Sequence, residues 1–318
     1  MSLSVVDFLK ECSQIERFSG GRDFATVSQD DIRHAAERFN LPLRHVEIAA
    51  LLENLIPRRY VENIPVLGRE GQVKLLRSTV AVVGAGGSGG YVCELLARAG
   101  VGHLIIIDPD HFDETNLNRQ LLSTEVDIGK PKAAVASSRI AKVNSAVEVR
   151  YVIERATEET VLPLIEGATV LVDCVNTDGA RIALQMACKR LKIPMVHGTI
   201  GGYIGRVMTI MPGDIGVLAF YDNLKKTTRP NSCKEEAKEA DYFLSLGSPT
   251  VTPAAIAPWQ VAETIKIITG KGEILRNRVL VIDMLSGSAA VIPLGAVRLG
   301  KLIRRIFRPT HGDMRVPK

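Results

Sequence analysis

The sequence has few cysteines, and none of them is spaced for a shared metal ion. Its 318 residues include five cysteines, an odd number, and no two of them form a Cys-x-x-Cys pair. The five are Cys12, Cys93, Cys174, Cys188 and Cys233. Disulfide-stabilised domains and four-cysteine zinc sites both need paired cysteines. We therefore expect neither a disulfide framework nor a zinc ion.

A long apolar run is also missing. No stretch approaches the roughly 18 uninterrupted apolar residues that a membrane-spanning helix needs. Residues 1–18 contain acidic side chains, whereas a secretion signal has a basic start followed by an apolar segment. The sequence therefore predicts a cytoplasmic protein with no membrane partner.

Neither sign of charge predominates along most of the chain. The formal net charge is +5, and 46% hydrophobic with 24% charged residues is ordinary globular composition. Residues 298–318 differ, with seven basic residues and one acidic residue. We interpret them as a solvated basic tail, with docking to an acidic protein as the alternative.

The first 57 residues show helical patterns. Ser28 followed by Asp31 predicts a capped helix start, and Pro42 separates this helix from a second one. Two helices with a tight link suggest a helix-turn-helix, but acidic residues such as Glu47 follow in the helix that would enter DNA. We therefore predict a helical N-terminal extension over residues 1–57 that packs or docks, and no nucleic-acid partner.

From Thr79 onward, apolar β-branched runs alternate with helical patterns, which indicates a parallel sheet. The expected strands are 79–83, 103–108, 147–153, 168–173, 195–197 and 278–284, and the expected helices are 91–99, 180–191 and 254–269. The sequence thus predicts an α/β fold with a Rossmann-like, doubly wound, mostly parallel sheet. This domain is expected over residues 58–297, followed by the tail over residues 298–318.

A glycine loop follows the first expected strand. Gly84, Gly86 and Gly89 complete the pattern Gly-x-Gly-x-x-Gly, with Gly87 between them, and a helix begins directly after. Missing side chains allow the backbone to approach phosphate groups, and the helix N-terminus supplies free N–H groups. Asp108 ends the second strand, where it is placed to accept hydrogen bonds from a ribose. The pattern predicts a nucleotide site, and a dehydrogenase remains an alternative.

Three cationic side chains follow the ribose acid within 25 residues, namely Arg119, Lys130 and Lys132. Together they carry enough positive charge to neutralise a triphosphate. A nicotinamide dinucleotide presents only a pyrophosphate. The order of these residues therefore favours ATP over NAD.

Four segments in this order, VAVVGAGGSGG, LARAGVGHLIIIDPD, ETNLNRQ and DIGKPKA, resemble the MoeB/ThiF/HesA family of ATP-dependent adenylyltransferases. These enzymes are relatives of the ubiquitin-activating enzymes. A weaker similarity extends to Asp283, so that about two thirds of the chain is covered. The resemblance implies a homodimer that binds ATP and Mg²⁺. Its partner would be a small ubiquitin-like sulfur-carrier protein ending in Gly-Gly, as in molybdopterin or thiamine biosynthesis. The C-terminal carboxylate of this carrier would attack the α-phosphate of ATP to give an acyl-adenylate and pyrophosphate.

The resemblance also implies residue roles. The nucleotide-binding set is Gly84, Gly86, Gly87, Gly89, Asp108, Asp110, Asn116, Arg119, Gln120 and Lys132. In this set Asp108 would hold the ribose, and Arg119 and Lys132 would hold phosphates and act in catalysis. Asn116 and Gln120 would shape the loop around the phosphates.

The sequence departs from the family at three places. Asn176 stands where the family has the Asp that binds magnesium, so either Asp178 is the Mg²⁺ ligand or adenylation is weakened. Glu62 replaces an arginine that in family dimers reaches the neighbouring subunit's ATP, leaving Arg58 or Arg59 as substitutes. The zinc-binding Cys-x-x-Cys pairs are absent. Two alternatives thus stay open: a weakened subunit that binds ATP or a partner, and adenylation of a non-protein substrate.

Cys233 is a further candidate for catalysis. It lies in a polar segment beside Lys234, which favours the thiolate, just before the segment that crosses the active site in relatives. A relay of the activated carboxyl group and a plain exposed cysteine are the two interpretations. His197, at a strand end, is interpreted as a core residue and not as a catalytic base. The catalytic candidates are Arg119, Lys132, Asn176, Asp178 and Cys233.

Overall fold

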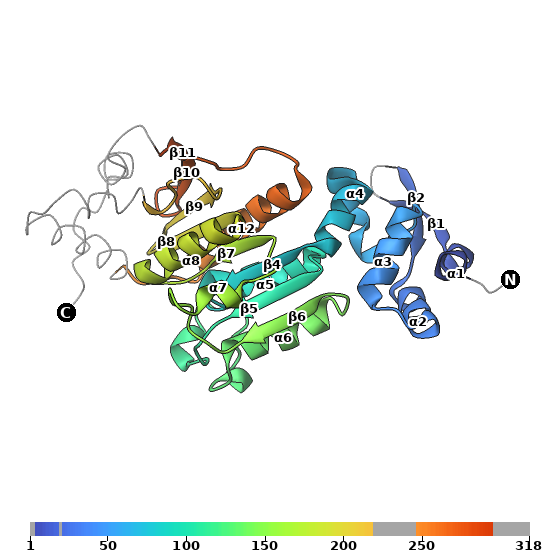
Figure 1. Cartoon of the computed structure of the whole chain (residues 1–318), viewed down its shortest axis with the longest axis horizontal. Helices are drawn as coiled ribbons and strands as arrows, with labels where there is room; N and C mark the ends of the chain where they lie inside the picture. Colours follow the sequence, from blue (N-terminus) through green and yellow to red (C-terminus); the bar gives the residue numbers. More distant parts are fainter. Residues whose placement is uncertain (1–3, 19–20, 219–245, 295–318) are drawn as a thin grey trace, which may run out of the picture.

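A computed structural model describes residues 4–18, 21–218 and 246–294 of the chain. A small N-terminal unit lies at one end of a larger α/β unit (Figure 1). In the described residues no helix is long and apolar enough to cross a membrane. Cys233 and the basic tail lie outside the described residues.

The N-terminal unit contains the expected helices and also a three-stranded sheet. Its elements are α1 Val5–Cys12, β1 Gln14–Phe18, β2 Arg22–Val27, α2 Gln29–Phe39, α3 Leu43–Leu52 and β3 Ile56–Pro57. The capping box predicted for α2 is confirmed, because the Asp31 N–H donates to Ser28 Oγ and the Ser28 N–H donates to Asp31 Oδ2, both at 3.1 Å. The order of the sheet is β1-β2-β3.

This sheet corrects the expectation of a purely helical extension. β1 and β2 form an antiparallel hairpin of five and six residues, and β3 adds a two-residue parallel edge. Within the hairpin only Thr26 and Val27, at the end of β2, are buried, and β3 is buried but only two residues long. Short strands with so little burial leave no clear alternation of apolar and polar residues, which is why the pattern did not reveal them.

The α/β unit is built on an eight-stranded sheet in the order β11-β10-β9-β8-β7-β4-β5-β6. The strands are β4 Thr79–Val83, β5 His103–Ile107, β6 Glu148–Val152, β7 Val170–Asp173, β8 Met195–Gly201, β9 Ile204–Ile210, β10 Arg278–Asp283 and β11 Ser288–Pro293. The run from β6 to β8 is parallel, and β9 to β11 extend it antiparallel. The predicted α/β class with a mostly parallel sheet is therefore confirmed.

Helices cover both faces of this sheet (Figure 1). They are α4 Ile64–Arg77, α5 Gly87–Ala99, α6 Lys132–Val143, α7 Val161–Leu164, α8 Asp178–Leu191 and α12 Val251–Thr269, with short 3₁₀ helices η1 Arg58–Asn63, η2 Glu114–Asn116 and η3 Glu125–Asp127. Alternate residues of β4 enter two cores: Val80 and Val82 pack under α5, α6 and α12, whereas Ala81 and Val83 pack under α7 and α8. This period of two explains why the buried strands are apolar throughout.

A buried polar network joins the two units. Glu47 on α3 is 1% exposed and accepts a 3.0 Å hydrogen bond from the Tyr60 hydroxyl. Asn144, at the end of α6, donates to that same hydroxyl at 3.0 Å and to the Ala97 carbonyl at 2.9 Å. Burial raises the pKa of Glu47 from 4.5 to about 7, although Arg59 opposes the shift.

We expect Glu47→Gln to remove part of the pH dependence of stability. The native state keeps a proton on Glu47 that the unfolded chain loses between pH 4.5 and about 7, so the free energy of unfolding should fall as the pH rises through that window. In the Gln variant the fall should shrink by about 1–3 kcal/mol. Denaturant unfolding at pH 5 and pH 8 measures it. The exposed Glu53→Gln is the control, and an unchanged pH slope in Glu47→Gln would contradict the assignment.

Candidate functional site

A cavity of about 480 Å³ lies where the carboxyl ends of β4, β5, β7 and β8 meet. The strand order turns at β4, since β5 and β7 lie on its two sides, and such switch points are where open α/β sheets bind ligands. The sequence-predicted residues that line the cavity are Gly84, Gly86, Gly87, Asp108, Asp110, Arg119, Gln120, Lys132 and Asn176. Residues from five separate segments are thus brought together.

Two glycines of the loop are required by the backbone itself. Gly84 has φ +94°, and a Cβ there would lie 2.5 Å from the Cys174 carbonyl oxygen. A Cβ on Gly89 would lie 1.8 Å from the Gly84 carbonyl oxygen. Gly89 does not line the cavity. Its missing side chain allows the first turn of α5 to pack against the loop.

Asp108 braces the loop. Its side chain is almost fully buried, and its Oδ2 accepts a 2.6 Å hydrogen bond from the Ala85 N–H while its Oδ1 accepts one of 2.8 Å from the Asp110 N–H. Burial raises the pKa of Asp108, and these two backbone hydrogen bonds oppose the shift. Each carboxylate oxygen keeps a lone pair for a ligand hydroxyl.

Lys132 is a nearly buried cation at the cavity wall. It is 7% exposed, and its ammonium group lies 3.4 Å from Asp110 Oδ2. Its backbone N–H also donates to the Asp110 carbonyl at 2.9 Å. A cation with one weak ion pair in a buried position is well suited to bind a phosphate. Lys130, by contrast, is exposed, pairs with Asp127, and does not line the cavity.

The loop after η2 also lines the cavity, through Arg119 and Gln120. Gln120 is 7% exposed and lies against Gly86, and among the described residues its Oε1 has no hydrogen-bond partner. Arg119 donates from Nη1 to the Thr115 carbonyl at 2.9 Å and to Asn118 Oδ1 at 2.8 Å. Asn116 does not line the cavity and instead caps the turn of η2. This loop therefore presents one cation and one unpaired amide to a ligand.

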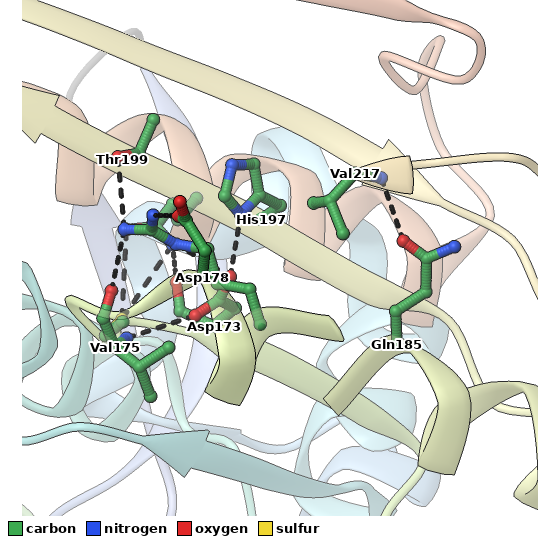
Figure 2. Close-up of polar contacts among 10 residues, drawn as sticks. Asp173, Val175, Asp178, Gln185, His197, Thr199 and Val217 are labelled. Carbon is green, nitrogen blue, oxygen red and sulfur yellow. Dashed lines mark hydrogen bonds and ion pairs between the residues drawn. The ribbon is translucent and has the colours of Figure 1, made fainter. Parts of the chain in front are cut away.

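The loop between β7 and α8 carries the predicted metal position. Asn176 is exposed and lines the cavity. Asp178 does not line the cavity, because it begins α8 and its Oδ1 accepts a 2.9 Å hydrogen bond from Arg181 Nη1. Asp173 lies behind the loop, fully buried, and its Oδ2 is 2.6 Å from Nδ1 of His197 (Figure 2).

His197 occupies the core, as the sequence suggested. Burial lowers its pKa, although Asp173 opposes the shift. Cys174 lines the cavity, but burial raises its pKa to about 12, so its thiol stays protonated near neutral pH. Neither side chain is therefore suited to base or nucleophilic chemistry.

Several polar lining residues were not predicted as site residues from the sequence, among them Glu154, Arg155, Arg181, Thr199 and Ser248. Arg181 follows Asp178 at a helical spacing of three, which indicates an ion pair on one helix face and not a site residue. Thr199 and Ser248 belong to no motif. Only the fold brings them to the cavity.

The two substitutes for the arginine missing at Glu62 are paired within the chain. Arg58 lies 2.8 Å from Glu16, and Arg59 lies 3.6 Å from the buried Glu47. These ion pairs hold the two arginines against the N-terminal unit. Their suggested reach to a neighbouring subunit stays a prediction.

Comparison with known proteins places this site in a family. The ThiF family model matches residues 59–298. The chain belongs to the ThiF family. It is 33% identical over 229 residues to a sulfur carrier protein adenylyltransferase of Thermus thermophilus, which covers 71% of this chain and 82% of that one. It is 30% identical over 227 residues to the SAMP-activating enzyme E1 of Haloferax volcanii, covering 71% and 80%.

Solved structures show the same fold. Escherichia coli MccB, solved with MccA-N7isoASN, aligns with a TM-score of 0.64 at 21% identity and covers 90% of this ThiF-family chain and 96% of that one. The match therefore extends into the N-terminal unit, beyond residues 59–298. The expected MoeB/ThiF/HesA membership is confirmed, and the names of the curated relatives confirm the expectation of an adenylyltransferase.

Gly84→Ala should destabilise this ThiF-family chain through a backbone clash. The new Cβ would meet the Cys174 carbonyl at 2.5 Å in addition to the strain of a positive φ. We expect a loss of about 3 kcal/mol or more in the free energy of unfolding. Gly129→Ala isolates the strain, because Gly129 has φ +82° with nothing within 4 Å of a Cβ, and about 1 kcal/mol is expected. Equal losses in denaturant unfolding would contradict the clash.

Proposed function

We propose that this chain is an ATP-dependent adenylyltransferase that activates the C-terminal carboxylate of a small ubiquitin-like sulfur-carrier protein. The observation that carries the proposal is one cavity in which Asp108 braces a phosphate loop while Arg119 and Lys132 face the same space. The names of the curated relatives support the substrate class.

The residues suit an attack on the α-phosphate. The glycine loop and the N-terminus of α5 would receive the phosphates, and Asp108 would accept hydrogen bonds from the ribose hydroxyls. A carboxylate oxygen of the carrier bonds to the α-phosphorus, the bond from that phosphorus to the bridging oxygen breaks, and pyrophosphate leaves. The mixed anhydride with AMP gives the acyl group a good leaving group.

Arg119 and Lys132 would stabilise the charge of the transition state. Negative charge spreads over the phosphate oxygens as the leaving pyrophosphate separates, and pre-positioned cations stabilise it most. Lys132 is already fixed by Asp110, whereas Arg119 has to exchange its contacts with Thr115 and Asn118 for phosphate oxygens. We propose that Gln120, whose Oε1 is unpaired among the described side chains, accepts a hydrogen bond there from a donor group of the nucleotide.

Magnesium would enter as Mg-ATP and screen the phosphate charge. The chain offers the neutral amide oxygen of Asn176 at the cavity, and the described residues hold no cluster of three or more metal-ligating side chains. Mg²⁺ is commonly held by one or two carboxylates together with phosphates and waters, so Asn176 fits as a weak additional ligand. A direct role of Asp178 stays a prediction, and its ion pair with Arg181 counts against it.

The neutral amide of Asn176 at the cavity also supports a second candidate function. With an amide in place of a carboxylate at Asn176, the chain would be a weakened family member that binds ATP or a partner with little turnover. The proposal also includes homodimer assembly, a cytoplasmic location, a carrier that ends in Gly-Gly and a relay through Cys233. Independence from zinc stays a prediction.

Exchange of labelled pyrophosphate into ATP tests the proposal. The protein is mixed with Mg-ATP, labelled pyrophosphate and a carrier ending in Gly-Gly, with a carrier shortened by its last glycine as the control. Exchange that needs the complete carrier supports the proposed function. If the parent shows none and Asn176→Asp restores it, the weakened-subunit candidate replaces the proposal.

Arg119→Ala and Lys132→Ala should each slow this exchange strongly. Removal of one pre-positioned charge-stabilising group costs about 2–4 kcal/mol of transition-state free energy, or roughly 30- to 1,000-fold in rate. Lys130→Ala is the matched control, because this lysine is two residues from Lys132 but pairs with Asp127 away from the cavity. Parental exchange rates in both Arg119→Ala and Lys132→Ala would overturn the assigned roles.

A further inference from the structure

We infer that Arg181 is the positioning residue of the nucleotide site: its guanidinium fixes the loop between β7 and α8 that presents Asn176 to the cavity. The inference rests on the proposed function only for the reaction assigned to that cavity. The loop geometry and its effect on nucleotide binding are independent of the reaction.

The guanidinium contacts the loop on both sides of Asn176. Arg181 Nη2 donates to the Val175 carbonyl at 2.9 Å, and Nη1 donates to Asp178 Oδ1 at 2.9 Å. Val175 directly precedes Asn176, and Asp178 follows two residues later. The backbone that carries Asn176 is therefore held at both ends by one side chain.

The same side chain ties the loop to the neighbouring strand. Nη2 also donates to Thr199 Oγ1 on β8 at 3.1 Å, and Figure 2 labels the three partners Val175, Asp178 and Thr199. Arg181 Nε lies 3.9 Å from Asp173 Oδ2, at the end of β7. Arg181 thus joins the ends of β7 and β8 to the first turn of α8.

Only an arginine can make these contacts together. Its planar fork presents several N–H groups in fixed directions, whereas a lysine ammonium is one point charge on a flexible stem. The side chain is 13% exposed, so water screens the contacts little. The fork therefore sets loop geometry as well as charge.

The charge also matters to the nucleotide. Arg181 pairs with Asp178 and lies near Asp173. The second partner of Asp173 is His197, whose pKa is lowered by burial, so that it adds little positive charge. Without Arg181 these carboxylates would lose their nearby cation at the rim of a site for phosphates. Loss of the guanidinium should therefore weaken nucleotide binding through loop displacement and through repulsion.

The test is a double-mutant cycle read by ATP binding. Calorimetry gives the dissociation constant for ATP, with and without Mg²⁺, for the parent, Arg181→Met, Asp178→Asn and the double variant. We expect Arg181→Met to raise that constant about tenfold or more, and Asp178→Asn to raise it less. In the double variant, Asp178→Asn should not raise the dissociation constant beyond that of Arg181→Met, because the ion-pair partner of Asp178 is already removed. Arg276→Met, which removes an exposed ion pair with Asp214 outside the cavity, should leave the constant unchanged.

Two outcomes overturn the inference. If the losses of Arg181→Met and Asp178→Asn add, and Asp178→Asn raises the Mg²⁺ requirement in both backgrounds, Asp178 is a metal ligand and not the anchor of Arg181. If Arg181→Met binds ATP like the parent, the loop does not depend on the guanidinium.

Two milder variants separate positioning from direct phosphate contact and guard against misfolding. Arg181→Lys keeps the charge and loses the fork, so loop displacement predicts a clear weakening of ATP binding that is smaller than in Arg181→Met, whereas direct phosphate contact predicts near-parental binding. Thr199→Val removes one acceptor at constant volume and should weaken ATP binding about threefold, which parental binding would contradict. If Arg181→Met does not fold, these two carry the test. A parent that binds ATP but exchanges no pyrophosphate would overturn the proposed function and leave this inference standing.

Discussion

The Asp108 carboxylate holds the nucleotide site together. Through Ala85 it fixes the glycine loop at the end of β4, and through Asp110 it fixes the turn at the end of β5. The Asp110 carbonyl and carboxylate in turn hold the backbone and the ammonium group of Lys132. One buried acid therefore sets the relative position of the glycine loop, the turn at the end of β5 and the ammonium group of Lys132, which are the proposed contacts of the nucleotide.

The opposite side of the cavity is organised by a cation in place of an acid. Arg181 pairs with Asp178, which does not line the cavity, whereas the neutral Asn176 of the same loop does. The described lining consequently holds four cations, Arg119, Lys132, Arg155 and Arg181, whereas the loop that carries Asn176 brings no carboxylate to it. This balance favours binding of the triphosphate through side chains and leaves much of the metal coordination to the nucleotide itself.

Local patterns predicted the glycine loop and six of the eight strands of the large sheet, because each strand is a short apolar run and the loop and Asp108 lie within 25 residues. The strands β9 and β11 were not predicted. The glycine pattern predicted Gly89 as a nucleotide contact, but Gly89 does not line the cavity and is needed for close packing against Gly84. Arg181 was missed because its partners are six residues before it, three before it and eighteen after it. The N-terminal sheet was missed because short, half-exposed strands give no periodic signal.

The central claim is that this charge arrangement selects ATP, and calorimetric titration of the parent protein with Mg-ATP and with NAD tests it most directly. Lys130 lies outside the cavity, but four cationic side chains line it, namely Arg119, Lys132, Arg155 and Arg181. A triphosphate carries more negative charge to pair with them than the pyrophosphate of a dinucleotide does. The account predicts tighter binding of Mg-ATP than of NAD. Tighter binding of NAD would contradict it.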